Sequence, residues 1–271
     1  MSFAEKYGPW ALVAGASDGV GSAFAAALAG RGVNVVLLSR RPSVLAELAS
    51  SLSDRFGVQT RVLAVDLASD DAASTVIDGT QDLEIGMLVY CAGADPDFKP
   101  FLAQPVSSAE AMLRRNCLVP VQLSHHYAQG MVSRARGGIV IFGSGAGFAG
   151  GPNMVAYSAT KAFDMVFAEA LWTELHDKGI DVLGLILSKT DTPALRRLEH
   201  TRGTIATTDE RPKDAVPVDD VISEAFDNLT NGPTWIVGEA MRAGAQMLGS
   251  VSRNDAVRFI MQASAASMGN D

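Results

Sequence analysis

The sequence contains few cysteines and no cysteine motif. Of its 271 residues only Cys91 and Cys117 are cysteines, and neither belongs to a CxxC pair. A disulfide framework needs several paired cysteines, and a thiolate metal site needs clustered ones. The sequence therefore predicts neither a disulfide framework nor a metal site, and it favours a reducing, cytoplasmic location.

Clustered basic residues and a long apolar leader are also missing. The chain has 22 Lys and Arg against 30 Asp and Glu, which gives a net charge of −8. A surface for nucleic acid or for anionic membranes needs clustered basic side chains, so we expect no nucleic-acid partner. Residues 1–10 contain Glu5, Lys6 and Pro9 and lack the apolar run of a signal peptide. We therefore expect no export and no membrane span.

The sequence does contain a regular alternation of short apolar runs and helical stretches. Helical stretches are expected at residues 22–31, 43–56, 107–134 and 153–177. The apolar runs, typical of strands buried on both faces, occupy residues 10–14, 33–38, 60–65, 87–90, 138–142, 180–187 and 234–237. This alternation predicts an α/β fold, a doubly wound Rossmann-like sheet of about seven parallel strands with helices on both faces. Ligands of such sheets bind beyond the carboxyl ends of the strands.

No domain boundary is visible in the sequence. Repeats, low-complexity linkers and composition breaks are absent, and 271 residues fit a single α/β domain. We therefore expect one catalytic domain over residues 1–271. The polar segment 193–219 interrupts the alternation before the last strand, and we expect a loop that covers the substrate. Residues 263–271 are expected to form a flexible tail.

Three glycines lie at the turn between the first strand and its helix, where residues 15–21 read GASDGVG. Glycines at such a turn let backbone amides approach a pyrophosphate at the positive end of the helix. The position of the turn, after the first strand, is the one that dinucleotide-binding folds use. We therefore expect this turn to bind a nicotinamide dinucleotide.

The end of the second strand distinguishes the two nicotinamide cofactors in folds of this type. An acidic residue there binds the ribose diol of NAD(H), but residues 33–46 include no Asp or Glu. Arg40 offers instead a planar cation that suits the 2′-phosphate of NADP(H), or it merely solubilises the start of a helix. The sequence therefore favours NADP(H) over NAD(H). Asp66, after the third strand, either meets the adenine amino group or caps the following helix.

Ser144, Tyr157 and Lys161 have the residue types and spacing of a hydride-transfer site. Tyr157 and Lys161 are four residues apart in a predicted helix, so both project from one face. Ser144 follows the apolar run 138–142, at the carboxyl end of a predicted strand. A carbonyl that accepts hydride needs an acid for its oxygen, a hydrogen-bond donor, and a cation that lowers the pKa of the acid. Tyr157, Ser144 and Lys161 fit these three roles in that order.

From Trp10 to about Gly238 the chain resembles the short-chain dehydrogenase/reductase family. The glycine turn is similar to the cofactor motif of that family, and Ala92-Gly93 to the end of its Asn-Asn-Ala-Gly segment. The matches to its catalytic tetrad are Asn116, Ser144, Tyr157 and Lys161. The resemblance implies that Lys161 also holds the nicotinamide ribose and that Asn116 supports a water chain to solvent.

The resemblance further implies an NADP(H)-dependent oxidoreductase, usually a homodimer or homotetramer, that interconverts a carbonyl and a secondary alcohol. We expect a small, largely apolar substrate, selected by residues 98–107, 145–155 and 193–219. The expected cofactor-binding residues are Gly15, Ser17, Gly19, Val20, Gly21, Arg40, Asp66, Leu67, Ala92, Gly93, Tyr157, Lys161, Thr190 and Thr192.

The chain departs from the family pattern at three places. Ala14 replaces a usual Thr, Tyr90-Cys91 replace paired asparagines, and Leu187-Ser188 replace a Pro-Gly pair. These changes leave a second hypothesis open, a non-catalytic NADP(H)-binding sensor or scaffold of the same fold. The complete tetrad argues against this second hypothesis.

Overall fold

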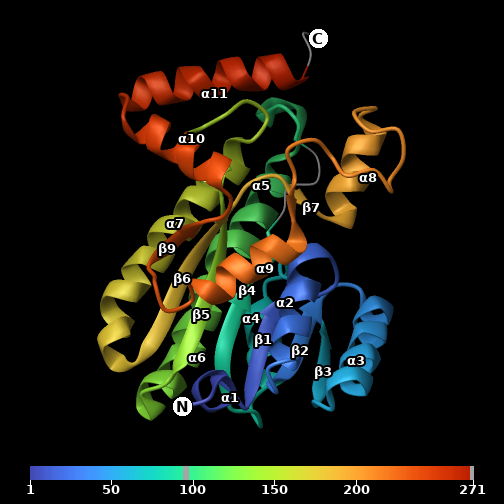
Figure 1. Cartoon of the computed structure of the whole chain (residues 1–271), viewed down its shortest axis with the longest axis vertical. Helices are drawn as coiled ribbons and strands as arrows, with labels where there is room; N and C mark the ends of the chain where they lie inside the picture. The colour runs from blue at the N-terminus through green and yellow to red at the C-terminus, as the bar shows by residue number, and fades with distance from the viewer. Residues whose placement is uncertain (94–97, 269–271) are drawn as a thin grey trace.

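A seven-stranded parallel sheet forms the centre of the computed structural model, which describes residues 1–93 and 98–268 (Figure 1). The strand order is β3-β2-β1-β4-β5-β6-β9, so the chain winds outward from β1 in one direction and then in the other. The strands are β1 Trp10–Ala14, β2 Asn34–Ser39, β3 Thr60–Ala64, β4 Ile85–Tyr90, β5 Gly137–Ser144, β6 Ile180–Leu187 and β9 Thr234–Ile236. All seven predicted strands are present, and the predicted doubly wound fold is confirmed.

Helices cover both faces of the sheet because each strand buries alternate side chains on opposite faces. In β1, Ala11 and Val13 belong to one apolar core, while Leu12 and Ala14 belong to the other. Helices α2, α3 and α9 pack on the first core, and α4, α6 and α7 on the second. The helices are α1 Phe3–Tyr7, α2 Gly19–Ala29, α3 Pro42–Phe56, α4 Ala72–Asp78, α5 Val106–Leu113, α6 Val119–Arg134, α7 Val155–Leu175, α8 Pro193–Thr201, α9 Val218–Asp227, α10 Glu239–Gly249 and α11 Arg253–Met268.

The predicted helix 107–134 is not continuous. Between α5 and α6 the residues Arg114–Leu118 form a π-helical turn, which contains the buried Asn116. A π turn widens the helix by one residue per turn and often marks a functional site. The apolar periodicity continues through this turn, so the sequence gives no sign of it.

The segment 193–219 is more ordered than the expected loop. It contains α8 and the strand β8 Val216–Pro217, which pairs with β7 Thr190–Asp191. Helix α8 begins where the Thr192 hydroxyl accepts a hydrogen bond from the Leu195 amide at 3.1 Å. Its covering role stays a prediction. Helices α8, α10 and α11 lie at one end of the molecule, beyond the sheet (Figure 1). Of the expected tail 263–271, residues 263–268 continue α11, and 269–271 lie outside the described residues.

The turn between β1 and α2 is tightly packed. A Cβ on Gly21 would overlap the carbonyl oxygen of Gly15 within the same turn. By contrast, a Cβ on Gly244, in the middle of α10, would meet no atom within 4 Å. The two glycines therefore provide a matched pair for measuring how much this turn constrains the fold.

Gly21→Ala is expected to lower the free energy of unfolding by about 1–3 kcal/mol, because the turn must open to admit the methyl group. Gly244→Ala is expected to raise it by up to about 1 kcal/mol, since alanine favours a helix interior. Urea denaturation followed by circular dichroism measures both values. Equal effects of the two substitutions would contradict the close packing at Gly21.

Candidate active site

Tyr157 and Lys161 lie in the first two turns of α7, on the same face of the helix. The Lys161 ammonium lies 5.9 Å from the centre of the Tyr157 ring. It donates hydrogen bonds to the carbonyl oxygen of Phe142 in β5 at 2.8 Å and to Asp164 Oδ2 at 2.9 Å. Lys161 is only 4% exposed, whereas Tyr157 is partly exposed. The structure thus joins a buried cation to an accessible phenol.

The ionisation of Lys161 follows from its neighbours. Burial by itself lowers the pKa of this ammonium, but the Asp164 carboxylate, together with Tyr157 and Cys91, raises the pKa above its ordinary value. Lys161 is therefore a cation throughout the neutral range.

Ser144 ends β5 and starts a 3-10 turn over Gly145–Gly147. Its Oγ accepts a hydrogen bond from the Ala146 amide at 3.2 Å, which leaves the hydroxyl hydrogen available to a ligand. A Cβ on Gly147 would lie 2.6 Å from the backbone carbon of Lys161, so glycine lets this turn pack against α7. The turn thereby fixes the end of β5 beside the helix that contains Tyr157.

Asn116 is buried in the π-helical turn and links three segments of the site. Its Nδ2 donates to Thr160 Oγ1 on α7 at 2.9 Å and to the Gly93 carbonyl at 3.3 Å. Gly93 has φ +131°, and a Cβ there would lie 2.9 Å from Asn116 Oδ1. Tyr90 helps to hold this turn because its hydroxyl donates to the Arg115 carbonyl. Tyrosine at position 90 therefore makes a contact of its own to the turn that contains Asn116.

The glycine turn brings backbone segments together at the carboxyl ends of β1 and β4. Gly15 has φ +89°, and a Cβ there would lie 2.9 Å from the Ala92 amide nitrogen. Gly19 starts α2 with φ +52°, and a Cβ there would lie 2.7 Å from Thr192 Cγ2. The positive end of α2 and its free amides suit a pyrophosphate, and the tight backbone contacts leave no room for side chains. The residues present fit a dinucleotide.

A cavity of about 470 Å³ adjoins this turn. Its lining includes seven of the expected cofactor residues and their neighbours: Gly15, Ser17, Asp18, Ser39, Arg40, Arg41, Val65, Asp66, Leu67, Cys91, Ala92, Gly93, Arg115, Ala194 and Arg197. The strand ends and the start of α8 thus line one cavity that contains several charged side chains. The structure brings the sequence-predicted residues from four separate segments together here.

Charges in this cavity are mostly positive. Arg41 donates to Ser17 Oγ and to the Ser17 carbonyl, both within 3.2 Å. Asp18 caps α2 and also pairs with Arg197 at 2.7 Å and with Arg41 at 3.7 Å. The negative charge of Asp18 is therefore balanced by two arginines. Arg40 is exposed and lies at the edge of the same cavity.

The remaining predicted cofactor residues occupy different places. Asp66 Oδ1 accepts from the Ala68 amide at 3.0 Å, whereas α4 has Asp71 at its cap, so Asp66 does not cap that helix. Val20 is buried in α2. Thr190 is buried in β7 and donates to the Ser188 carbonyl at 3.1 Å, outside the cavity lining. Thr192 caps α8 and faces Gly19.

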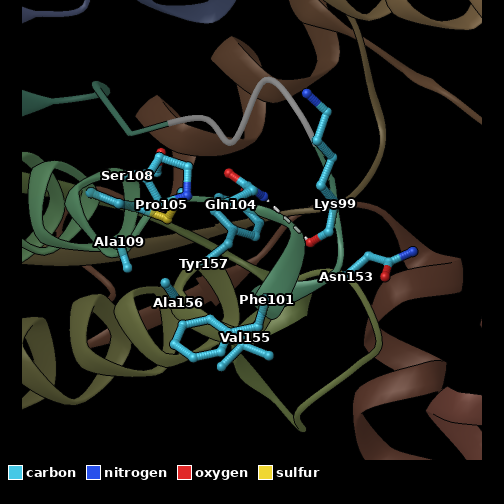
Figure 2. A pocket seen from close by; sticks show the side chains of 11 residues that line it. Lys99, Phe101, Gln104, Pro105, Ser108, Ala109, Asn153, Val155, Ala156 and Tyr157 are labelled. Atoms are coloured by element: carbon cyan, nitrogen blue, oxygen red, sulfur yellow. Dashed lines mark hydrogen bonds between the residues drawn. The ribbon is translucent and has the colours of Figure 1, made fainter.

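Tyr157 lines a second, narrower pocket. Its walls come from residues 99–112 and from residues 153–157 (Figure 2). Its enclosed volume is about 30 Å³, room for about one water, so a larger ligand must displace wall side chains. Two of the three expected substrate segments form these walls, and the third, 193–219, instead reaches the cofactor-side cavity.

Phe98 connects the narrow pocket to the polar segment 193–219. Its ring meets the edge of the Tyr157 ring at 6.1 Å, and the Arg202 guanidinium lies 5.2 Å from its centre. An aromatic ring thus stands directly beside the phenol that would meet a substrate.

Sequence reasoning missed Asp164, Arg41, Arg115 and Arg197. Asp164 lies seven residues after Tyr157, on the same helix face, and this spacing could have identified it. Arg41 adjoins Arg40 in sequence and could have been included. Arg115 and Arg197 reach the cavity through the π-helical turn and through α8, neither of which has a sequence signal for its position.

Metal-ligand clusters of three or more His, Cys, Asp or Glu are absent from residues 1–93 and 98–268. Both cysteines are unpaired thiols, and burial raises the pKa of Cys91 to about 12 and that of Cys117 to about 11. Neither thiol is reactive at neutral pH. In the described part of the chain, the helices are too short or too polar for a membrane crossing.

Comparisons with known proteins agree with this geometry. The family model described as short chain dehydrogenase matches residues 9–203. A 7beta-hydroxysteroid dehydrogenase of Clostridium sardiniense is 33% identical over 260 residues, which cover 95% of this chain and 96% of that protein.

Two solved structures have similar folds. One, from work on 7beta-hydroxysteroid dehydrogenase stereoselectivity, has a TM-score of 0.87 and 29% identity, with 96% of this chain and 99% of that chain covered. A short-chain dehydrogenase from Sphingobium yanoikuyae in complex with NADPH has a TM-score of 0.72 and 28% identity, with 90% and 96% covered. The match of the family model, the sheet order and the placement of Ser144, Tyr157 and Lys161 show that the chain belongs to the short-chain dehydrogenase family.

Proposed function

We propose that this protein uses NADP(H) to interconvert a carbonyl and a secondary alcohol on an apolar, steroid-like substrate. The observation that supports it most is the position of Tyr157. This phenol lines the narrow pocket, and Lys161 on the same helix face holds a buried positive charge 5.9 Å from its ring. An accessible acid beside a fixed cation is what protonation of a nascent alkoxide requires.

The cofactor-side cavity supports NADP(H). Arg40 and Arg41 lie at its edge after β2, and no acidic residue there could bind a ribose diol. Asp18, which would repel a phosphate, is paired with Arg41 and Arg197. A guanidinium binds phosphate oxygens with two parallel hydrogen bonds, so this edge suits a 2′-phosphate.

The reaction assigns one role to each side chain of the site. When bound, the nicotinamide supplies hydride in reduction and accepts it in oxidation. Ser144 Oγ donates a hydrogen bond to the substrate oxygen, and Tyr157 donates the proton that converts the alkoxide to an alcohol. Lys161 favours the phenolate form of Tyr157 after that transfer. Asn116 keeps the segment at Gly93 against α7, where proton exchange with solvent can follow.

The substrate class is inferred from the relatives and from the pocket walls. Similar proteins are named 7beta-hydroxysteroid dehydrogenases, and the walls around Tyr157 include Phe101, Met112 and Val155. A rigid, apolar ring system would contact these side chains after the walls have moved apart, because the pocket as it stands has room for about one water. Gln104 and Asn153 provide the polar contacts that orient it.

We further propose a cytoplasmic homo-oligomer. Leu113, Leu118, Val121 and Val166 are between 36% and 58% exposed on α5, α6, α7 and the π-helical turn. Burying these side chains between copies of the chain would stabilise a dimer. The two unpaired cysteines are consistent with a reducing compartment.

Tyr157→Phe is expected to lower kcat for NADPH-dependent ketone reduction at least ~100-fold, because the proton donor is lost. The dissociation constant for NADPH should change less than about threefold. Nicotinamide absorbance and fluorescence titration measure the two quantities with a 7-ketosteroid. Tyr127→Phe removes a hydroxyl that bonds Thr80 far from the pocket and serves as the control. Unchanged turnover in Tyr157→Phe, or tight NADPH binding that no carbonyl substrate consumes, would favour the sensor hypothesis instead.

Arg40→Ala and Arg41→Ala are each expected to weaken NADPH binding about tenfold or more, since each removes a charge-assisted contact to the 2′-phosphate. NADH binding should change less than about twofold. Fluorescence titration with both cofactors gives the ratio, and Arg55→Ala, an exposed arginine at the far end of α3, controls for net charge. Equal losses of affinity for the two cofactors would contradict phosphate recognition.

A further inference from the structure

Asp164 is a buried carboxylate beside the proposed catalytic lysine. It is 3% exposed, and its Oδ2 accepts the hydrogen bond from Lys161 Nζ at 2.9 Å. The two side chains of this pair are 6% and 4% exposed. Every other ion pair among the described residues has at least one side chain that is 30% or more exposed. Asp164 is therefore the one deeply buried countercharge within this part of the chain.

Stability alone does not explain this pair. A buried ion pair seldom stabilises a fold more than apolar side chains of the same volume, because both charges lose their hydration. The second oxygen, Asp164 Oδ1, is buried and accepts no hydrogen bond from the described residues, which adds a further cost. Burial accordingly raises the pKa of Asp164, and Lys161 only partly offsets this effect.

The geometry at Lys161 indicates what the carboxylate does. An ammonium has three N–H donors, and the Phe142 carbonyl and Asp164 Oδ2 accept two of them. One donor remains for the side that faces Tyr157, whose ring centre lies 5.9 Å away. Rotation of the ammonium is thus restricted by two acceptors on different elements, β5 and α7.

We propose that Asp164 is a positioning residue that keeps Lys161 charged and directs its free N–H toward Tyr157 and the bound cofactor. The inference rests on the proposed function and extends it to the residue that orients Lys161 and keeps it charged. The hydrogen bond of Asp164 goes to Lys161, and the carboxylate acts on the reaction through that lysine.

Other titratable groups near the pair do not ionise in the assay range. Burial raises the pKa of Cys91 to about 12 and of Cys117 to about 11, and it raises the pKa of Tyr90 well above its ordinary value. Arg115 keeps its charge at every accessible pH. A change in the alkaline limb of the pH profile when the Asp164 charge is removed therefore reports on Lys161.

Asp164→Asn keeps the shape and the acceptor but removes the negative charge. The Asp164 carboxylate raises the pKa of Lys161, so without this anion the ammonium loses its proton at lower pH than in the wild type. Reduction needs the charged ammonium of Lys161, and kcat should therefore fall at a lower pH than in the wild type. Removal of a unit charge a few ångström from an ionisable group shifts the pKa of that group by about one unit or more.

The test measures kcat for NADPH-dependent reduction as a function of pH. It compares the pH at which kcat falls on the alkaline side in the wild type, Asp164→Asn, Asp164→Ser and Glu174→Gln. Glu174 is an exposed carboxylate near the end of α7, so Glu174→Gln makes the same charge change away from the site. Asp164→Ser also removes the charge and adds no volume. If one of the two Asp164 variants does not fold, the other still provides the test. NADPH affinity, measured by fluorescence without substrate, is followed over the same pH range.

The proposal is supported if the alkaline limb of the kcat profile moves by at least about half a pH unit to lower pH. NADPH affinity should then also weaken at a correspondingly lower pH. A smaller shift, a shift to higher pH, or a profile like that of Glu174→Gln overturns it, even when the variant is less stable. Failure of the proposed function is distinguishable, because the wild type would then consume no NADPH at any pH.

Discussion

The buried ammonium of Lys161 is the constraint on which the rest of the site depends. It joins α7 to β5 through the Phe142 carbonyl, two residues before Ser144 at the end of that strand. The link fixes the distance between the strand that contains the serine and the helix that contains the tyrosine. Gly147 reinforces it, because the turn after Ser144 can lie directly on the Lys161 backbone only without a side chain. A cation that is costly to bury is thus used to hold two separate segments in register.

Small residues and a widened helix turn bring the remaining segments to this centre. Gly15 lets the first turn approach the backbone at Ala92, and Gly93 makes room for Asn116. Asn116 reaches both Gly93 and α7 from the π-helical turn. The result is two spaces, a wide cavity with charged side chains beside the glycine turn and a narrow pocket beside Tyr157 with both apolar and polar walls. The wide cavity offers the volume and the charged side chains that the proposed cofactor requires, and the narrow pocket is the one that Tyr157 lines.

The sheet was predictable because parallel strands covered on both faces are almost continuously apolar, as residues 138–142 and 180–187 are. The placement of Ser144 at a strand end and of Tyr157 and Lys161 on one helix face was predictable from residue type and spacing, and their catalytic roles stay a prediction. The π-helical turn was not, since Arg114–Leu118 contain neither glycine nor proline and keep the helical periodicity. Helix α8 has the signals of a helix start, Thr192 followed by Pro193, but surrounding polar residues hide them. Which arginines line the cavity beside the glycine turn depends on tertiary placement, so Arg115 and Arg197 could be assigned only from the structure.

The placement of Asp164 shows why the sequence pattern alone does not reveal every residue that contributes to this site. In sequence, a carboxylate three residues after a lysine resembles an ordinary surface pair of a solvated helix. Here the helix face is covered, so the same spacing produces a pair screened from water, with one oxygen unsatisfied. An exposed pair would contribute little and would leave the lysine free to rotate. The buried pair instead restricts the lysine to one orientation, at the expense of stability, on the one helix face where orientation affects proton transfer.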